Sequence, residues 1–187
     1  MAAQPYDTDA IDLLMSDHRK VDGLFKEYES RNGGDPERKR QLVDEMIHEL
    51  SVHAAIEEEV LYPFMRRNVQ GGEELADEGI EEHQKAKRLL ADLEQLDPQD
   101  ATFDRRVGQL VADVRHHVEE EEAEFFPRLR QMASAEELGQ LGRRLEAAKR
   151  FAPTHPHPNA PSTPPGNIIA GTAAAAIDKV RDKLKGN

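Results

Sequence analysis

Apolar residues recur every three or four positions through most of the first 150 residues, with polar residues between them. This spacing is typical of helices that bury one face in a bundle. Runs of β-branched residues are scarce, and the helix formers Leu, Glu, Arg, Gln and Ala are common. Turn-forming sequences interrupt the pattern at RNGGDP, at QGG and at DPQD. The pattern therefore predicts four long helices, at 8–30, 36–68, 73–96 and 101–131.

A fifth, shorter helix is predicted at 135–149, because Ser134 and Glu137 have the spacing of a capping box. Pro63 and Pro127 fall within or at the end of long helices, so we expect a kink or a helix end at each. The expected fold class is all-α: an up-down four-helix bundle with this short fifth helix and an extended C-terminal tail.

The composition changes abruptly after Phe151. The stretch APTHPHPNAPSTPPGN contains six prolines and has no apolar periodicity, which predicts an extended linker. An Ala-rich stretch then carries Ile177, Val180 and Leu184 on one helical face, and a helix this short is expected to dock on the bundle or on a partner. The expected organisation is a bundle at 1–150, a Pro-rich linker at 151–171 and a short amphipathic helix at 172–187.

Polar or ionisable residues interrupt the apolar stripe near the middle of each long helix. The six residues concerned are His18, His53, Glu57, His83, His117 and Glu121. A buried carboxylate or imidazole without a partner costs several kcal/mol. The six could satisfy one another in a hydrogen-bonded network, but a metal centre would satisfy all of them at once. We therefore favour a metal centre at mid-height in the bundle.

An internal repeat supports this interpretation. Residues 53–63 (HAAIEEEVLYP) and 117–127 (HVEEEEAEFFP) both fit H-x3-E-E-x2-[LF]-[YF]-P, and an acidic-His pair recurs at DH and EH before them. Each half of the chain then supplies one lone His and one His-x3-Glu. Because i and i+4 lie on one helix face, the imidazole and the carboxylate can reach the same metal ion or adjacent ions. Two facing hairpins would supply the ligands of a dinuclear site.

With these motifs and their helix order, residues 10–130 resemble the hemerythrin-like, HHE cation-binding family. Residue types alone permit Fe, Mn or Zn, and the resemblance favours two iron ions. The Pro-rich tail is also similar to the C-terminal extension of some bacterial members. The resemblance implies that His18, His53, His83 and His117 ligate the irons, and that Glu57 and Glu121 bridge them beside an oxo, hydroxo or water bridge.

One position departs from the family's pattern. Oxygen-carrying hemerythrins have a fifth His one turn before the His of the third helix, and Gly79 stands there in this sequence. One iron would then keep an open position, a water, or a carboxylate such as Glu78 or Glu82. Because Gly inside a helix costs about 1 kcal/mol relative to Ala, we expect Gly79 to leave a small cavity beside the metal.

Further His, Glu and Tyr residues lie outside the six. We expect surface or solvated positions for His48, His116, His155 and His157, and mostly solvated helix faces for Glu58 and Glu122. As an alternative, Glu58 or Glu122 could orient an imidazole. Tyr62 is a candidate for a hydrogen bond near the site.

Charge and composition narrow the function. The 25 basic and 37 acidic residues give a formal net charge of −12, which argues against binding to a nucleic-acid backbone. The chain has no Cys, so disulfides, thiolate metal sites and iron–sulfur clusters are excluded. No apolar run approaches the ~20 residues of a membrane span, and the first residues lack the pattern of a secretion signal. We therefore expect a cytoplasmic protein that binds neither nucleic acid nor membrane.

These observations favour a non-heme di-iron protein that binds O2 or a related small molecule, peroxide or nitric oxide, in sensing, oxidative-stress defence or iron handling. The missing fifth His weakens the case for a stable oxygen carrier. One alternative is a catalase-like enzyme that consumes peroxide. Another is a metal-stabilised module that binds a partner without catalysis, in an oligomeric state that the sequence leaves open.

Overall fold

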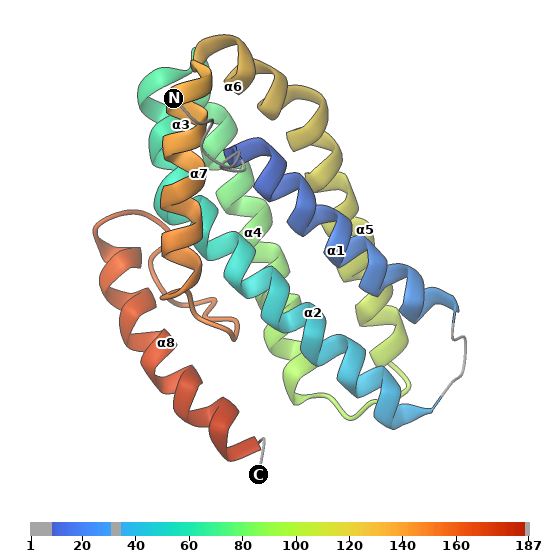
Figure 1. The fold of residues 1–187 in the computed structure, drawn as a ribbon. Helices are drawn as coiled ribbons and strands as arrows, with labels where there is room; N and C mark the ends of the chain where they lie inside the picture. Colours follow the sequence, from blue (N-terminus) through green and yellow to red (C-terminus); the bar gives the residue numbers. More distant parts are fainter. Residues whose placement is uncertain (1–8, 31–34, 186–187) are drawn as a thin grey trace, which may run out of the picture.

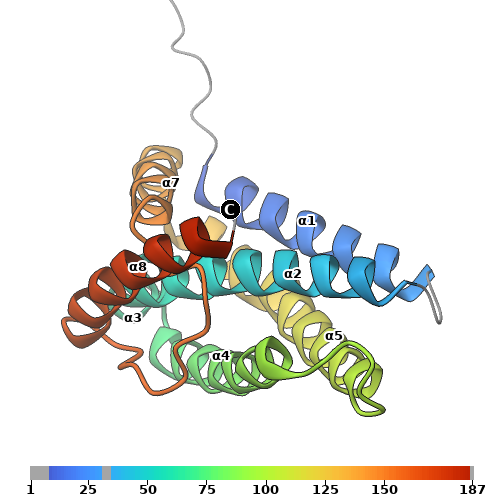
Figure 2. The ribbon, with the colours of Figure 1, turned by 90° about the horizontal axis from the view of Figure 1, so that it is seen from below.

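The computed structural model describes residues 9–30 and 35–185, and this part of the chain forms four helical rods that lie alongside one another (Figures 1 and 2). The first rod is α1 (Ala10–Ser30) and the third is α4 (Gly72–Gln95). The second rod comprises α2 (Pro36–Ile56), the π-helical segment η1 (Glu57–Leu61) and α3 (Tyr62–Asn68). The fourth comprises α5 (Phe103–Glu120), the π-helical segment η2 (Glu121–Phe125) and α6 (Phe126–Met132). The expected all-α bundle is confirmed.

The rods begin and end close to the predicted positions, because the local signals are strong. Asp35 caps α2, accepting a hydrogen bond from the Glu37 amide at 3.1 Å. Ser134 caps α7 (Ala135–Lys149), and the capping box with Glu137 is present. The predicted start at residue 8 and the turn at 31–34 lie outside the described residues.

Pro63 and Pro127 occupy equivalent places in the second and fourth rods. Each lies in the first turn of a short α-helix that directly follows a π-helical segment. Proline has no N–H, and its ring would clash with the carbonyl four residues earlier in an ordinary α-helix. The wider π turn accommodates this conflict, and the Tyr62 and Phe126 amides bond five residues back, to Glu57 and Glu121. Each rod therefore continues past its proline.

Two apolar clusters fill the bundle, one on each side of a polar layer. One cluster contains Leu14, Ile56 and Phe126, and α7 closes it from outside through residues such as Leu141. The other contains residues nearer the opposite end of the rods, among them Phe25, Val43, Leu90 and Phe103. Between them lie the six residues that interrupt the apolar stripes, all buried.

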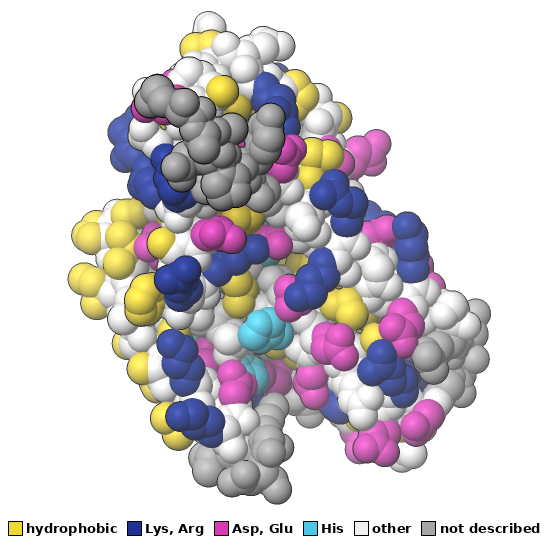
Figure 3. Space-filling view, in the orientation of Figure 1, with side chains coloured by type: hydrophobic (Ala, Val, Ile, Leu, Met, Phe, Trp, Pro, Cys, Tyr) yellow, Lys and Arg dark blue, Asp and Glu magenta, His cyan; other side chains and the backbone are white. Residues whose placement is uncertain are grey.

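The tail differs from its expected form. The last helix, α8, spans Gly166–Lys185 and so begins before the predicted start at Thr172. It lies outside the four rods and buries its Ala174, Ala175 and Asp178 face. Ile177 and Val180, on the predicted apolar face, are 66% and 59% exposed, and hydrophobic side chains gather along this edge (Figure 3). The side chain of Leu184 lies outside the description.

His155 corrects another expectation, because it is buried rather than solvated. Its Nδ1 contacts Glu94 of α4, and its Nε2 lies 2.8 Å from Asp182 Oδ1 of α8. His157 is half-buried and lies 3.1 Å from the buried Asp178. Two acidic residues of α8 thus hold the linker, and His155 joins it to the bundle. Among the described helices, none is long and apolar enough to cross a membrane.

Candidate metal centre

The structure brings all six predicted site residues into one buried layer. They form two groups whose potential ligand atoms lie within 4.8 Å of one another: His18, His53, Glu57 and Glu121 in one, and Glu57, His83 and His117 in the other. The first group draws its imidazoles from α1 and α2, and the second from α4 and α5. Because Glu57 belongs to both groups, one carboxylate connects two potential cation positions.

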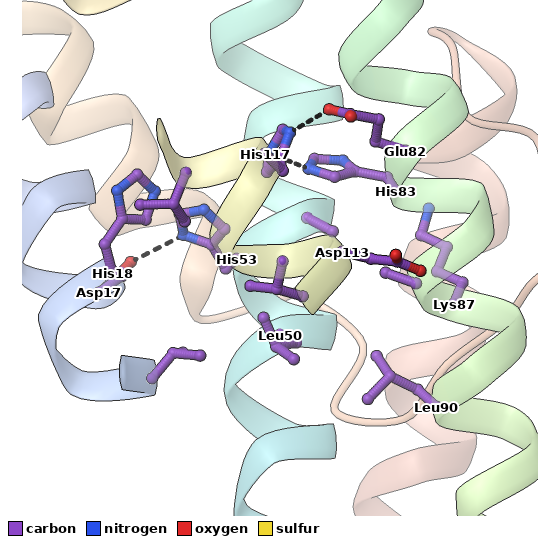
Figure 4. Close-up of a pocket in the computed structure, with 15 residues that line it drawn as sticks. Asp17, His18, Leu50, His53, Glu82, His83, Lys87, Leu90, Asp113 and His117 are labelled. Carbon is purple, nitrogen blue, oxygen red and sulfur yellow. Dashed lines mark hydrogen bonds and ion pairs between the residues drawn. The ribbon is translucent and has the colours of Figure 1, made fainter. Parts of the chain in front are cut away.

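Every imidazole turns its Nε2 atom toward one of the two inner carboxylates. His53 and His83 lie 3.3 Å from Glu57 Oε2 by this atom. His18 and His117 lie 3.3 Å and 3.6 Å from Glu121 Oε2. Figure 4 shows the four rings converging, with Asp17 and Glu82 bonded from outside.

The inner atoms fit a cation better than they fit one another. Both oxygens of Glu57, both oxygens of Glu121 and the Nε2 atoms of His18 and His53 are buried without a hydrogen-bond partner. Burying so many unsatisfied polar atoms is strongly unfavourable. Neutral imidazoles and carboxylates are also the nitrogen and oxygen ligands that divalent transition metals accept. The residues present therefore fit a metal centre.

A second set of carboxylates faces the outer nitrogens of the imidazoles and hydrogen-bonds three of the four. His18 Nδ1 donates to Glu122 at 2.9 Å, and His83 Nδ1 donates to Glu58 at 3.2 Å. The other two contacts are His117 Nδ1 with Glu82 at 2.8 Å and His53 Nδ1 with Asp17 at 3.5 Å. Such a partner fixes the ring and its tautomer, so that Nε2 faces the metal.

The two hairpins hold each other's lone histidine. Glu57 and Glu58 contact the two ring nitrogens of His83, and the ring of Tyr62 lies 5.5 Å from the same imidazole. In the other half, Glu121 and Glu122 contact the two nitrogens of His18, while Phe126 stacks on it at 5.7 Å. In both halves, the two Glu residues and the final aromatic residue of the repeated E-E-x2-[LF]-[YF] motif thus contact the lone histidine of the opposite hairpin.

The π-helical segments place the glutamate pairs. Both η1 and η2 begin at the first Glu of the motif. Consecutive residues of a regular α-helix point in directions about 100° apart. The π-helical segment lies where two adjacent carboxylates must reach opposite edges of one imidazole. π turns inside helices are frequent at functional sites.

Burial and mutual charge perturb the ionisation of the layer. Burial raises the pKa of the Glu57 carboxyl well above its ordinary value, and Glu121 raises it further. Burial also opposes ionisation of Glu121, but His117 and His18 outweigh it and lower that pKa. The pKa of His83 is well below its ordinary value because of burial and of neighbouring His117. A neutral His83 keeps a lone pair available for a metal.

Residues 9–129 match the family model described as the hemerythrin HHE cation-binding domain. The chain belongs to this family. An uncharacterized hemerythrin-like protein of Schizosaccharomyces pombe is 33% identical over 175 residues, which cover 93% of this chain and 85% of that protein. Together with the buried His and Glu clusters, the family indicates metal binding.

Two further comparisons agree with this family. A crystal structure of a hemerythrin HHE cation-binding domain-containing protein from Mycobacterium kansasii has a similar fold, with a TM-score of 0.63 at 21% identity over 76% of this chain and 85% of that one. A Nostoc protein named DNA nickase is 35% identical over 138 residues, or 74% of this chain. The chain spans only 38% of the length of that protein.

In this hemerythrin-type chain Tyr62 fills the space into which a side chain at position 79 would point. A Cβ atom at position 79 would lie 2.6 Å from the Tyr62 hydroxyl oxygen and 2.9 Å from its Cζ. The Tyr62 hydroxyl in turn lies 3.3 Å from His83 Nε2. In the Cβ direction the missing side chain makes room for a phenol, while Gly79 also lines a pocket with His117 and Glu121, so the small cavity expected beside the metal-binding layer is present. The predicted hydrogen bond of Tyr62 near the site is present.

The role of Asp17 and Glu82 was missed, although the sequence contained a signal for it. The acidic residue before each lone His recurs in both halves, and in the structure it binds the other His of its own hairpin. Glu58 and Glu122, expected mainly at solvated faces, instead orient imidazoles. His48 and His116 have largely exposed side chains, as expected.

A cavity reaches the imidazoles of this hemerythrin-type layer from the side away from the π-helical segments. Its wall is mostly apolar, with Val21, Leu50, Ala86, Leu90 and Val114 beside the four histidines. Lys87 and Asp113 are polar residues of the same wall, and Figure 4 shows them on the side of His83 and His117. The cavity is suited to a small, weakly polar molecule next to the metal-binding layer.

Proposed function

We propose that this chain is a non-heme di-iron protein that binds O2 or a related small molecule, peroxide or nitric oxide, at the buried layer. The observation that carries the proposal is the pair of ligand groups that share Glu57, in which both inner carboxylates and the Nε2 atoms of His18 and His53 have no hydrogen-bond partner. His18 and His53 would hold one iron, and His83 and His117 the other. Glu57 and Glu121 would bridge them. When bound, the iron pair supplies one-electron redox chemistry between ferrous and ferric states.

The protein's own residues would control access and orientation. Hydrogen bonds from the outer carboxylates would fix three of the four rings, so these ligands need little rearrangement when metal enters. The apolar cavity wall would admit a small uncharged molecule and limit water around it. The Tyr62 hydroxyl lies 3.3 Å from His83 Nε2 and is a proton donor beside the second ligand group. It would hydrogen-bond to the small ligand or to a coordinating atom there.

Elemental analysis and an optical spectrum test the proposal directly. We expect about two irons per chain and a visible absorption that dithionite removes and O2 or peroxide restores. The variant His117→Ala should lose iron, whereas His48→Ala should keep it, because the side chain of His48 is 52% exposed. Equal iron loss in both variants, or a colourless protein that holds zinc, would contradict the assignment.

Peroxide separates binding from turnover. Steady consumption of peroxide with release of O2 would favour the catalase-like alternative, and a single spectral change without turnover would favour sensing. The DNA nicking activity named for the Nostoc relative is not part of our proposal. The net charge of −12 opposes binding to a phosphate backbone.

A further inference from the structure

A third group of potential ligands lies on the outer surface between α4 and α5. Glu82, His116 and Glu120 each offer an atom within 4.8 Å of the others. His116 Nε2 lies 3.4 Å from Glu120 Oε1, one turn along the same helix, and Glu82 faces them from α4. The side chain of His116 is 64% exposed, so ions in solution can reach this group.

A pocket leads inward from the same surface to the centre. Glu78, Glu82 and Glu120 line its outer part together with Glu124, and His117 and Glu121 line its inner part. Glu121 is buried, and neither of its carboxylate oxygens has a hydrogen-bond partner. An unsatisfied carboxylate therefore faces this pocket from the metal-binding layer.

The charge of the pocket is almost wholly negative. Neither Lys nor Arg is among the residues that line it. Arg128 binds Glu124 from outside at 3.1 Å, but within the part of the chain that the structure describes Glu78, Glu82 and Glu120 form no ion pair with Lys or Arg. A cleft lined by one sign of charge concentrates ions of the opposite sign and raises their rate of association, by tenfold or more.

The opposite side of the centre is neutralised. Lys87 binds both oxygens of Glu58 at 2.7 Å, and Lys149 binds Asp17 at 2.6 Å. Two of the four outer carboxylates are thus paired with lysines, both of them in the first hairpin. The two without lysine partners, Glu82 and Glu122, belong to the second hairpin, and Glu82 lines the pocket. This asymmetry directs cations to the α4 and α5 surface.

We propose that this acidic pocket is the path by which divalent cations reach the buried centre, with Glu82, His116 and Glu120 as a transient binding site at its outer end. Glu82 links the two stages, because its carboxylate also accepts a hydrogen bond from His117 Nδ1 at 2.8 Å. Carboxylate and imidazole ligands suit Fe2+, Mn2+ and Co2+. The inference rests on the proposed metal centre and adds how that centre is loaded.

Stopped-flow loading of the metal-free protein with Co2+ tests the path, because Co2+ gives a visible spectrum without O2. The test variant combines Glu78→Gln, His116→Ala and Glu120→Gln. Its matched control combines Glu81→Gln, His48→Ala and Glu119→Gln, which removes the same charges from exposed positions that do not line the pocket. Circular dichroism of both variants checks that they fold.

At low ionic strength we expect the test variant to load roughly tenfold more slowly than the control, which should load like the wild type. Salt should slow the wild type more than the test variant. The final Co2+ content should be equal in all three, because the buried ligands are unchanged. Loading of the test variant at the rate and salt dependence of the control would overturn the proposed path. A wild type that takes up no Co2+ would overturn the metal centre itself, and the path with it.

Discussion

His18 Nδ1 lies 2.9 Å from Glu122 Oε1, although 104 residues separate the two along the chain. The corresponding pair in the other half is His83 Nδ1 and Glu58 Oε1, at 3.2 Å. The second Glu of each motif therefore holds the histidine of the opposite hairpin. This contact explains why the motif contains two adjacent Glu residues. The first Glu lies in the inner layer, and the second orients a histidine.

Removing one of these outer carboxylates should weaken metal binding without removing a ligand. We expect Glu122→Ala to lower metal affinity by about 10–100-fold, because His18 loses the partner that fixes its ring. Competition with a chelator measures the change in Kd. The control is Glu119→Ala, an exposed position on the same rod. Unchanged affinity in Glu122→Ala would show that Glu121 and Phe126 are enough to orient His18.

Two glycines of the bundle should respond oppositely to the same substitution. A Cβ at Gly108 meets no atom within 4 Å, so Gly108→Ala should stabilise the protein by about 1 kcal/mol through helix propensity. At Gly79 the new methyl group would overlap Tyr62, and overpacking costs about 1–3 kcal/mol. Urea unfolding of the metal-free variants measures both.

The partner of Gly79 can be tested in a second background. When Tyr62→Ala removes the ring, Gly79→Ala should no longer destabilise the protein and should instead contribute its helix propensity. If Gly79→Ala changes the free energy of unfolding equally in both backgrounds, the contact with Tyr62 is not the reason that position 79 requires glycine.

Acid should loosen the attachment of α8. Burial opposes ionisation of Asp182, but hydrogen bonds from His155 and Thr154 outweigh it and lower its pKa below 3.8. Because the folded pKa is the lower one, this stabilisation is complete above 3.8 and is lost as pH falls through the folded value. The protection factors of α8 amides, which correct for the intrinsic pH dependence of hydrogen exchange, should therefore fall in acid.

The variant His155→Ala provides the control for this effect. It lacks the Asp182 partner, so the protection factors of its α8 amides should be lower already above the titration range and should change less in acid. If the protection of α8 amides depends on pH equally in the variant and the wild type, groups other than Asp182 cause the loosening in acid.

Truncation after Arg150 should leave the metal centre assembled. Every inner residue lies at or before Glu121. The tail contacts the outer residue Glu58, through Asn167 at its backbone carbonyl (3.1 Å) and through Ser162 at its side chain, which also stays bonded to Lys87. We expect the shortened chain to keep its metal content and visible spectrum. A truncated protein with an unchanged helical circular dichroism spectrum but without metal would show that the tail completes the site.

Helix positions and the members of the buried layer could be predicted because they depend on local signals. Ser134 with Glu137 marks a helix start within four residues, and the apolar stripe identifies His117 rather than His116 as inward-facing. The repeat then places His18 and His83 in equivalent positions. Each of these inferences needs only the periodicity of one helix or a comparison of two segments.

Pairing between rods could not be predicted from the same signals. Which carboxylate meets which Nδ1 depends on how far one rod is shifted along another, and the π segments change the direction of Glu58 and Glu122. The filling of Gly79 by Tyr62 and the burial of His155 also arise from contacts between distant segments. Proline content indicated a linker, but it could not show that His155 and His157 would meet acids of α8.

The exchange of partners between the two hairpins has a consequence for how the site comes into being. His18 of the first half contacts Glu122 of the second, and the equivalent His83 of the second half contacts Glu58 of the first. The same reciprocal pattern occurs at a two-fold interface between identical subunits. A single hairpin therefore supplies both imidazoles of one ligand group but lacks the carboxylate that the opposite hairpin contributes to that group. Metal capture by this layer reports that both halves of the chain have docked, and a partly assembled chain presents no complete ligand set.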